Sequence, residues 1–144
     1  MVIQNSCSIL IKQIHDELEK SANKALRPYD LTIVQAGVLL ALNEAEGRQL
    51  SLKELEKRFH VAQSTMAGIV SRLEQKDFVE VLENLDDKRI KKVLITQMGI
   101  DRCEKAELCM GEAETHILSC LTETERVIFF ALLRKVWASL NQAD

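Results

Sequence analysis

Four cations lie within five residues near the middle of the chain. They are Lys88, Arg89, Lys91 and Lys92. Asp86 and Asp87 precede them, and an apolar run flanks the group on each side, which predicts a β-hairpin with a charged tip. Cations at such a tip can neutralise DNA phosphates or enter a minor groove, whose negative potential favours arginine. A solvated charged turn is the alternative, so the interpretation depends on the elements before the hairpin.

A segment with helical periodicity precedes the hairpin and carries a polar face. Its apolar residues, spaced by three and four, are Met66, Ile69, Val70 and Leu73. By helical geometry the opposite side presents Ser64, Gly68, Ser71 and Gln75, with Thr65 and Arg72 at its flank. Such a helix can bury one face in the protein and place the other against a nucleic acid.

The start of this helix, residues 63–65, has the chemistry for contacts with DNA. Side chains there reach base edges while backbone N–H groups reach phosphates, and Gln63 could contact an adenine. Simple helix capping is the alternative for Ser64. Gly68 would let the helix approach the bases closely, because a mid-helix glycine otherwise costs up to about 1 kcal/mol relative to alanine. An unconstrained surface position is the alternative for Gly68.

Arg72 lies on the flank of the same face, near the end of the helix. Its guanidinium could reach a DNA phosphate, since arginine forms charge-assisted hydrogen bonds with phosphate oxygens. A salt bridge to Glu74 or Asp77 is the alternative use of this side chain. The residues alone leave both open.

A capping box and a short helix come before the polar helix. Ser51 and Glu54 have the spacing at which each side chain satisfies a backbone N–H of the first turn, and the predicted helix runs to Arg58. A turn at residues 59–61 leads to the polar helix, and the hairpin ends near Thr96. Two helices followed by a hairpin form a winged helix-turn-helix, whose second helix enters the DNA major groove.

The residues before this unit predict two helices. The first is expected over residues 3–26, where apolar residues recur at steps of three and four, and it ends before Pro28. The second begins at Thr32 and Gln35, which have capping-box spacing, and stops at Gly47.

The residues after the hairpin predict two more helices. Thr96 caps the first, and Thr122 with Glu125 forms a further capping box at the start of the second, which runs to about Leu140. The last helix is apolar over much of its circumference, and such a helix is usually buried on more than one side. A second subunit is the natural cover, so we predict a homodimer formed through the N- and C-terminal helices.

The predicted fold class is mainly α with a small β-hairpin wing: a winged helix-turn-helix flanked by N- and C-terminal dimerisation helices. The 144 residues suit a single domain (1–144), with dimerisation helices over 1–30 and 97–144 and a DNA-binding lobe over 31–96. A net charge of −3 and a pI of about 5.7 provide no bulk attraction to nucleic acid. Affinity for double-stranded DNA must therefore come from a local basic patch.

The cysteines lack the C-x-x-C spacing of a zinc ribbon or a redox-active disulfide. They are Cys7, Cys103, Cys109 and Cys120. Cys7 lies early in the first helix and is a candidate redox sensor, with a buried structural thiol as the plainer interpretation. Glu112, His116 and Cys120 share a predicted helical face at steps of four, as in a metal half-site. Because Cys120 also belongs to the apolar stripe, we predict no metal site.

Targeting and catalytic signals are missing from the sequence. No apolar run approaches the roughly 20 residues that cross a bilayer, and the N-terminus lacks the pattern of a secretory signal. We therefore expect a cytoplasmic protein without a membrane partner, in which the cysteines are free thiols. No glycine-rich phosphate loop, nucleophile motif or carboxylate pair indicates an enzyme or a resident cofactor.

Four short motifs follow one another along the chain. They comprise Leu31, Thr32 and Gln35; the runs 51–55, 61–65 and 72–74; Asp87, Arg89, Val93, Ile95, Thr96 and Gly99; and Leu121, Thr122 and Glu125. Their order and spacing resemble the MarR family of bacterial transcriptional regulators over nearly the whole chain. The chain departs from the family pattern at residues 76–78, where the family usually has a glycine, and at Glu80, where a basic residue is common.

The resemblance implies a homodimeric repressor that binds a pseudo-palindromic operator, with half-sites about 34–36 Å apart. It also implies that Asp87 orients the Arg89 guanidinium in the wing. A small aromatic or anionic effector ligand, or an oxidant, would release the DNA. The first, second and fifth helices would line the cleft for such a ligand.

A winged helix can also serve as a protein-interaction module without sequence-specific DNA binding. The acidic balance and Glu80 motivate this alternative. The salt dependence of DNA binding separates the two functions, because each neutralised phosphate releases counterions.

Overall fold

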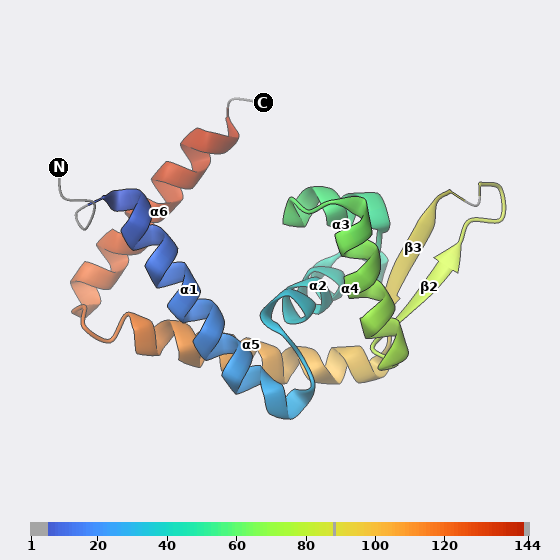
Figure 1. The fold of residues 1–144 in the computed structure, drawn as a ribbon, viewed down its shortest axis with the longest axis horizontal. Coiled ribbons are helices and arrows are strands. Elements are labelled where there is room, and N and C mark those ends of the chain that lie inside the picture. Colours follow the sequence, from blue (N-terminus) through green and yellow to red (C-terminus); the bar gives the residue numbers. More distant parts are fainter. Residues whose placement is uncertain (1–5, 88, 143–144) are drawn as a thin grey trace.

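The computed structural model describes residues 6–87 and 89–142 and is built mainly of helices (Figure 1). The elements in chain order are α1 (Cys7–Leu26), η2 (Arg27–Tyr29), α2 (Ile33–Glu44), η3 (Glu46–Arg48), β1 (Gln49–Ser51), α3 (Leu52–Phe59), α4 (Gln63–Gln75), β2 (Val79–Glu83), β3 (Lys91–Ile95), α5 (Gln97–Ile117) and α6 (Glu123–Asn141). The long helix α5 joins two parts, with α1 and α6 toward one end and the remaining helices and the sheet toward the other. The predicted winged helix-turn-helix with flanking helices is confirmed.

The first helix is shorter at its start than the periodicity predicts. Ser6 has extended backbone and serves as the N-cap of α1, whereas residues 3–5 lie outside the described part of the chain. At the other end Pro28 lies in the 3-10 turn η2, and Asp30 takes a left-handed conformation with φ 58°. Aspartate tolerates this region better than most residues, so the chain can reverse here without a glycine.

Helix α2 begins where predicted and forms the centre of the core. The Gln35 N–H donates to Thr32 Oγ1 at 3.2 Å and the Thr32 N–H donates to Gln35 Oε1 at 3.2 Å, which confirms the capping box. Val38, Leu39 and Leu42 are fully buried. The helix ends at Glu44, slightly before the left-handed Gly47 that the sequence marks as its stop.

The sheet has three strands rather than the two of a simple hairpin. Strands β2 and β3 form the predicted antiparallel hairpin, and β1 pairs with the other edge of β3, giving the order β1-β3-β2. Strand β1 was not predicted from the sequence. Val79, Val93 and Ile95 turn their side chains inward and seal the core beneath the sheet.

One core joins α2, α4, the sheet and α5. Its fully buried side chains include Leu39, Met66, Leu73, Val93 and Cys103. Burial of each large aliphatic side chain contributes about 1.5–3 kcal/mol. The apolar face of α4 is therefore well packed against the core, which holds its polar face toward solvent.

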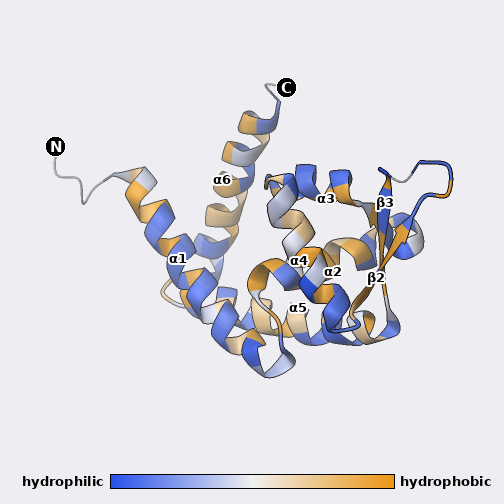
Figure 2. Cartoon of the chain, turned by 45° about the vertical axis from the view of Figure 1, so that its right-hand side comes forward, coloured by the Kyte–Doolittle hydropathy of each residue, from blue (hydrophilic) through white to orange (hydrophobic). Residues whose placement is uncertain are grey.

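Helices α1 and α6 leave large apolar side chains exposed. The hydropathy colours of Figure 2 show apolar residues recurring along both helices. On α1 these are Leu10, Ile11 and Ile14; on α6 they are Val127, Ile128, Phe130, Leu132, Leu133, Val136, Trp137 and Leu140. The Trp137 side chain is 59% exposed, and no described residue of α6 is buried. An exposed apolar surface of this extent marks an interaction face.

No single helix within residues 6–87 and 89–142 is long and apolar enough to cross a membrane. The bent pair Cys7–Tyr29 and Ile33–Glu44 meets that test only when its two parts are taken together, by length and composition alone.

Candidate nucleic-acid interface

The geometry of α3 and α4 begins with a second capping box. The Ser51 N–H donates to Glu54 Oε2 at 2.7 Å and the Glu54 N–H donates to Ser51 Oγ at 3.1 Å, as predicted. After α3, His60 takes a left-handed conformation with φ 53°. The Val61 N–H then donates to the Glu56 carbonyl at 3.2 Å, which closes the turn. These contacts fix the direction in which α4 leaves α3.

Helix α4 has the two faces that its spacing predicts. Met66, Val70 and Leu73 are buried, and Ile69 packs partly against the core. The opposite face is exposed to solvent along its length. Its exposed residues are Gln63, Ser64, Thr65, Gly68, Ser71, Arg72 and Gln75. The recognition-helix residues proposed from the sequence are therefore all accessible to a partner.

The N-terminus of α4 leaves backbone donors available. Ala62 is the N-cap, and no side chain among the described residues caps this helix, so Ser64 does not serve the capping role considered as its alternative. The first helical hydrogen bond runs from the Met66 N–H to the Ala62 carbonyl at 3.0 Å. The N–H groups of residues 63–65 precede it and can bind an anion at the positive end of the helix dipole.

Arg72 is exposed and free to act outside the chain. Within the described residues it forms no ion pair with Glu74 or Asp77, the alternative that the sequence left open. Glu74 instead accepts a hydrogen bond from the Val81 N–H at 3.2 Å. The recognition helix thereby holds the first strand of the wing.

The wing tip presents one arginine in a fixed direction. Asp87 Oδ1 accepts hydrogen bonds from the backbone N–H of Arg89 at 3.0 Å and from its Nε at 3.1 Å, while the Arg89 side chain remains 91% exposed. The hydrogen bonds from Arg89 hold the pKa of the Asp87 carboxyl below its usual value. Asp87 thus orients Arg89 as the resemblance implies. Lys88, also proposed as a contact, lies outside the described residues.

A groove of about 810 Å³ separates the start of α4 from the wing. Gln63 and Ala67 line it from the helix, and Arg89 and Lys91 line it from the wing. Residues from distant parts of the sequence therefore line the same groove. This arrangement is required if α4 and the wing are to contact the same DNA duplex.

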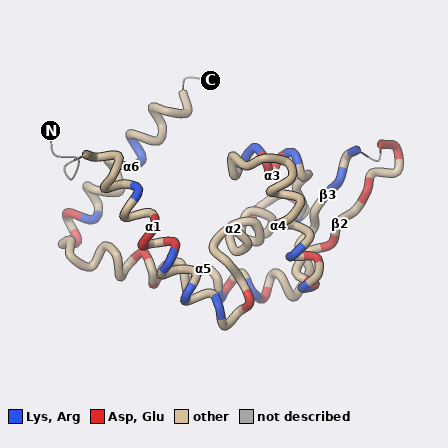
Figure 3. Tube along the Cα trace, in the orientation of Figure 1, with Lys and Arg blue, Asp and Glu red and all other residues tan. Residues whose placement is uncertain are grey.

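Lys53 is a groove residue that was not among the contacts proposed from the sequence. It lines the groove from α3, is exposed, and lies near enough to Asp87 to help lower the pKa of that carboxyl. The sequence signal for Lys53 was its position as a cation in the first turn of α3, the helix that precedes the recognition helix. Figure 3 shows cations on α3 and β3, and carboxylates along β2 and toward the hairpin tip. The local charge is therefore mixed, and its positive part lies on α3 and β3.

The cysteines fall into two classes. Cys7 and Cys120 are exposed free thiols, whereas Cys103 and Cys109 are buried. Burial raises the pKa of Cys103 to about 11 and also raises the pKa of Cys109. The buried pair are therefore protonated and unreactive at neutral pH. Cys7, the candidate redox sensor, is accessible at the start of α1, so the interpretation as a buried structural thiol is wrong for the single chain.

The predicted helical alignment of Glu112, His116 and Cys120 is wrong. Helix α5 ends at Ile117, so Cys120 lies beyond it and is not part of the apolar stripe. Over the described ranges 6–87 and 89–142, no three His, Cys, Asp or Glu side chains are placed to hold a metal ion.

Comparison with known proteins gives a consistent match. A model of the MarR family matches residues 29–90. The multiple antibiotic resistance protein MarR of Escherichia coli K12 is 30% identical over 128 residues, which are 88% of this chain and 88% of the relative. The HTH-type transcriptional regulator BilQ of Clostridioides difficile CD3 is 26% identical over 120 residues, covering 83% of this chain and 80% of the relative.

Solved structures share the same architecture. The crystal structure of an E. coli MarR mutant with operator DNA has a TM-score of 0.78 and 29% identity, covering 90% of this chain and 91% of that one. The Staphylococcus aureus MepR–DNA complex has a TM-score of 0.81 and 25% identity, covering 93% of this chain and 98% of that one.

Proposed function

The chain belongs to the MarR family, and we propose that it is a transcriptional regulator that binds double-stranded DNA as a homodimer. Its recognition helix is α4 and its wing is the β2–β3 hairpin. Relatives of the same architecture have been crystallised with DNA, among them E. coli MarR with its operator. The function requires no catalytic group and no resident cofactor.

The observation that carries this proposal is the shared groove between α4 and the wing. The uncapped start of α4 offers backbone N–H groups and Gln63, and the wing offers Arg89, already oriented by Asp87. Ser64, Thr65, Gly68 and Ser71 would face the major groove, with Arg72 on a phosphate and Lys88, Arg89 and Lys91 near the adjacent minor groove. Lys53 adds a further phosphate contact from α3.

The exposed apolar faces of α1 and α6 support the homodimer. A second copy would cover them and would place two recognition helices on one side of the duplex. Two-fold symmetry then requires a pseudo-palindromic operator with half-sites about 34–36 Å apart. Binding over a promoter would repress transcription.

Release from DNA would follow from a change in the spacing of the two lobes. A small aromatic or anionic ligand between the lobe and the dimer helices, or oxidation of the exposed Cys7, could favour the non-binding spacing. The exposure of Cys7 supports the oxidant, and no described group singles out a ligand.

A titration of the purified protein against its own upstream intergenic DNA, over a range of salt, tests the proposal. We expect tight binding to one fragment that weakens steeply as salt rises, and weak binding to random DNA. Peroxide that releases the DNA, with recovery on adding thiol, would support Cys7 as the sensor. No binding at low salt would contradict the regulator and leave a protein-interaction module.

A further inference from the structure

The turn that follows the recognition helix ends α4 in a defined way. Asp77 takes the left-handed conformation with φ 62°, its N–H donates to the Glu74 carbonyl, and the Phe78 N–H donates to the Leu73 carbonyl, both at 3.0 Å. This is a Schellman motif with aspartate where glycine is usual. Lys76 is the C-cap immediately before it.

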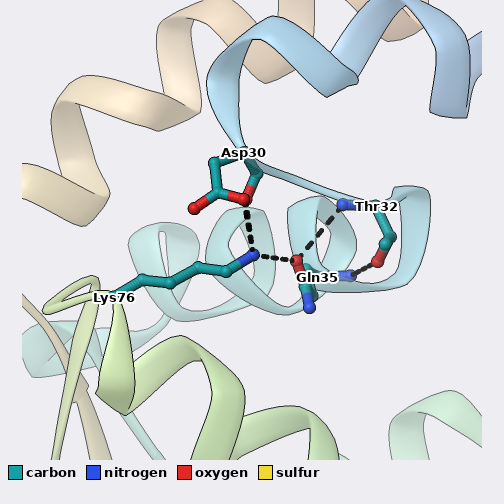
Figure 4. Close-up of polar contacts among 4 residues, drawn as sticks. All are labelled: Asp30, Thr32, Gln35 and Lys76. Atoms are coloured by element: carbon teal, nitrogen blue, oxygen red, sulfur yellow. Dashed lines mark hydrogen bonds and ion pairs between the residues drawn. The ribbon is translucent and has the colours of Figure 1, made fainter.

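Lys76 reaches across to the junction between α1 and α2 (Figure 4). Its Nζ lies 2.6 Å from the Asp30 carbonyl oxygen, 3.3 Å from Asp30 Oδ1 and 3.1 Å from Gln35 Oε1. The contacts with the Asp30 carbonyl oxygen and Gln35 Oε1 are hydrogen bonds, and the contact with the Asp30 carboxylate is an ion pair. The side chain of Lys76 is only 23% exposed, whereas that of Asp30 is 73% exposed, so the ammonium is partly shielded from solvent and the carboxylate is not.

The residues that accept hydrogen bonds from Lys76 lie directly after α1, the predicted dimerisation helix. Asp30 closes the turn after α1, and Gln35 is the capping-box residue of α2 and is itself buried. Asn23 of α1 accepts the Ile33 N–H at 2.7 Å. A continuous set of hydrogen bonds therefore runs from α1, through the start of α2, to the end of the recognition helix.

The same turn is held from its other side by α5. Thr96 Oγ1 donates to the Asp77 carbonyl at 2.6 Å, and the Thr96 N–H donates to the Phe78 carbonyl at 3.0 Å. Gly99 lets the first turn of α5 approach so closely that a Cβ there would collide with the Phe78 carbonyl oxygen. This attachment is close backbone packing, whereas the attachment through Lys76 is one flexible side chain and is the easier to open.

We propose that Lys76 is a positioning residue for DNA binding. Its contacts with Asp30 and Gln35, here called the clasp, set the angle of the recognition helix relative to the α1–α2 junction. The clasp thereby couples the predicted dimer helices to the face of α4 that contacts DNA. The proposal rests on the proposed function, because it concerns the same DNA site. Lys76 does not line the groove between α4 and the wing. Its effect on affinity therefore acts through geometry rather than through contact with DNA.

The test compares DNA affinity and its salt dependence for Lys76→Met, Lys76→Arg and Asp30→Asn, with Lys105→Met as the matched control. Lys105 is an exposed lysine on α5, outside the groove. We expect Lys76→Met to bind about 5- to 10-fold more weakly than Lys105→Met, a modest coupling effect, with an unchanged slope of log affinity against log salt. Lys76→Arg, which keeps the cation, should recover part of the loss.

Asp30→Asn separates positioning from charge by the sign of its effect. Removing a carboxylate makes the net charge of the chain less negative, so electrostatics alone predicts tighter DNA binding. Loss of the ion pair to Lys76 predicts weaker binding. A variant that binds more tightly than wild type would overturn the proposal.

Hydrogen exchange of the DNA-free protein provides a readout independent of DNA. In Lys76→Met we expect faster amide exchange in residues 30–36 and 76–78, and unchanged exchange in α3. The first range includes the Thr32 N–H, which donates to Gln35 Oε1, the same oxygen that Lys76 contacts. A slope reduced by about one for Lys76→Met would show a direct phosphate contact and overturn the positioning role. Unchanged affinity together with unchanged exchange would overturn the clasp itself.

Failure of the proposed function has a different signature. Wild-type protein that binds no upstream DNA at any salt would refute the regulator whatever the variants do. Exchange that is also unchanged would then overturn the clasp. Faster exchange would retain the clasp but refute its role in DNA binding.

Discussion

At the scale of single residues, Arg89 is held by its near neighbour Asp87 in a conformation suited to contact with DNA. Asp87 accepts hydrogen bonds from both the backbone and the side chain of Arg89, while the guanidinium stays in solvent. The side chain therefore loses little conformational freedom when it meets a partner. A surface ion pair of this kind adds little to the stability of the fold, so its value lies in orientation.

Arg89→Ala tests the wing directly. We expect affinity for operator DNA to fall by about 1–3 kcal/mol, and the salt slope to decrease by about one if the guanidinium meets a phosphate. Fluorescence anisotropy titrations at several salt concentrations measure both quantities. Lys105→Met is the control for the loss of one positive charge. If Arg89→Ala binds as tightly as that control, the wing has no part in DNA binding.

Because the Cys103 thiol is buried, we expect the folded protein to lose stability at alkaline pH. Burial, with Glu107 nearby, raises the pKa of its thiol from 9.0 to about 11, so the folded state disfavours the thiolate. The resulting stabilisation is fully present below pH 9 and is lost as the pH rises towards 11. Urea unfolding from pH 8 to 11 should show a shallower decline for Cys103→Ala than for wild type.

Cys120→Ala is the matched control, because its thiol is exposed. It should follow the wild-type pH dependence. Parallel curves for Cys103→Ala and wild type would show that the buried thiol does not titrate in this range.

At the scale of elements, the two open glycines offer a matched pair. Gly68 lies on α4 and Gly111 on α5, and a Cβ at either would have no atom within 4 Å. Internal packing therefore explains neither residue. Replacing each with alanine should stabilise the chain by about 0.5–1 kcal/mol, because glycine loses more backbone entropy in a helix.

Their effects on DNA binding should differ. If α4 approaches the bases closely at Gly68, Gly68→Ala weakens operator binding while it raises the melting temperature, and Gly111→Ala only raises it. Calorimetry and a DNA titration on the same samples measure the two effects. A Gly68→Ala protein with wild-type affinity would place that residue on an unconstrained surface, the alternative that the sequence left open.

Local chemistry explains which elements the sequence predicted well. The three capping boxes, at Ser51, Thr32 and Thr122, and the apolar stripe of α4 depend on neighbours within one or two turns, and all are confirmed. The charged hairpin tip and the Asp87–Arg89 contact are local in the same sense. Of the residues that line the groove from α4 and the wing, Gln63, Asp87, Arg89 and Lys91 were proposed from the sequence, whereas Ala67 and Ile90 were not.

Long-range pairing and chain ends explain what the sequence did not predict. Strand β1 has three residues and pairs with β3, as at Gln49 with Leu94, across most of the DNA-binding lobe. So short a strand has no periodicity to detect. The contact between Lys76 and Asp30 likewise joins segments that are far apart in the sequence. The end of α5 before Cys120 has no glycine or proline to mark it in the sequence.

At the scale of the whole molecule, the exposed apolar faces decide how the lobes are arranged on DNA. Helix α6 carries eight large hydrophobic side chains that are at least 48% exposed, and none of its described residues is buried. Leaving such a surface in water is costly, at about 25 cal/mol per Å² of apolar area. A second copy that packs α1 and α6 against their counterparts would bury it and fix the distance between two recognition helices.

Val136→Asp should therefore separate the dimer. Val136 is 60% exposed on α6, so the substitution should disturb one chain little, but at a subunit interface it would bury an unpaired carboxylate. We expect sedimentation velocity at micromolar concentration to show monomer, and operator affinity to fall because one lobe contacts only one half-site. Met98→Asp is the control, since Met98 is 50% exposed at the start of α5, beside the DNA-binding lobe. A Val136→Asp protein that still sediments as a dimer would show that α6 is not the pairing surface, and the spacing of the lobes would then depend on α1 alone.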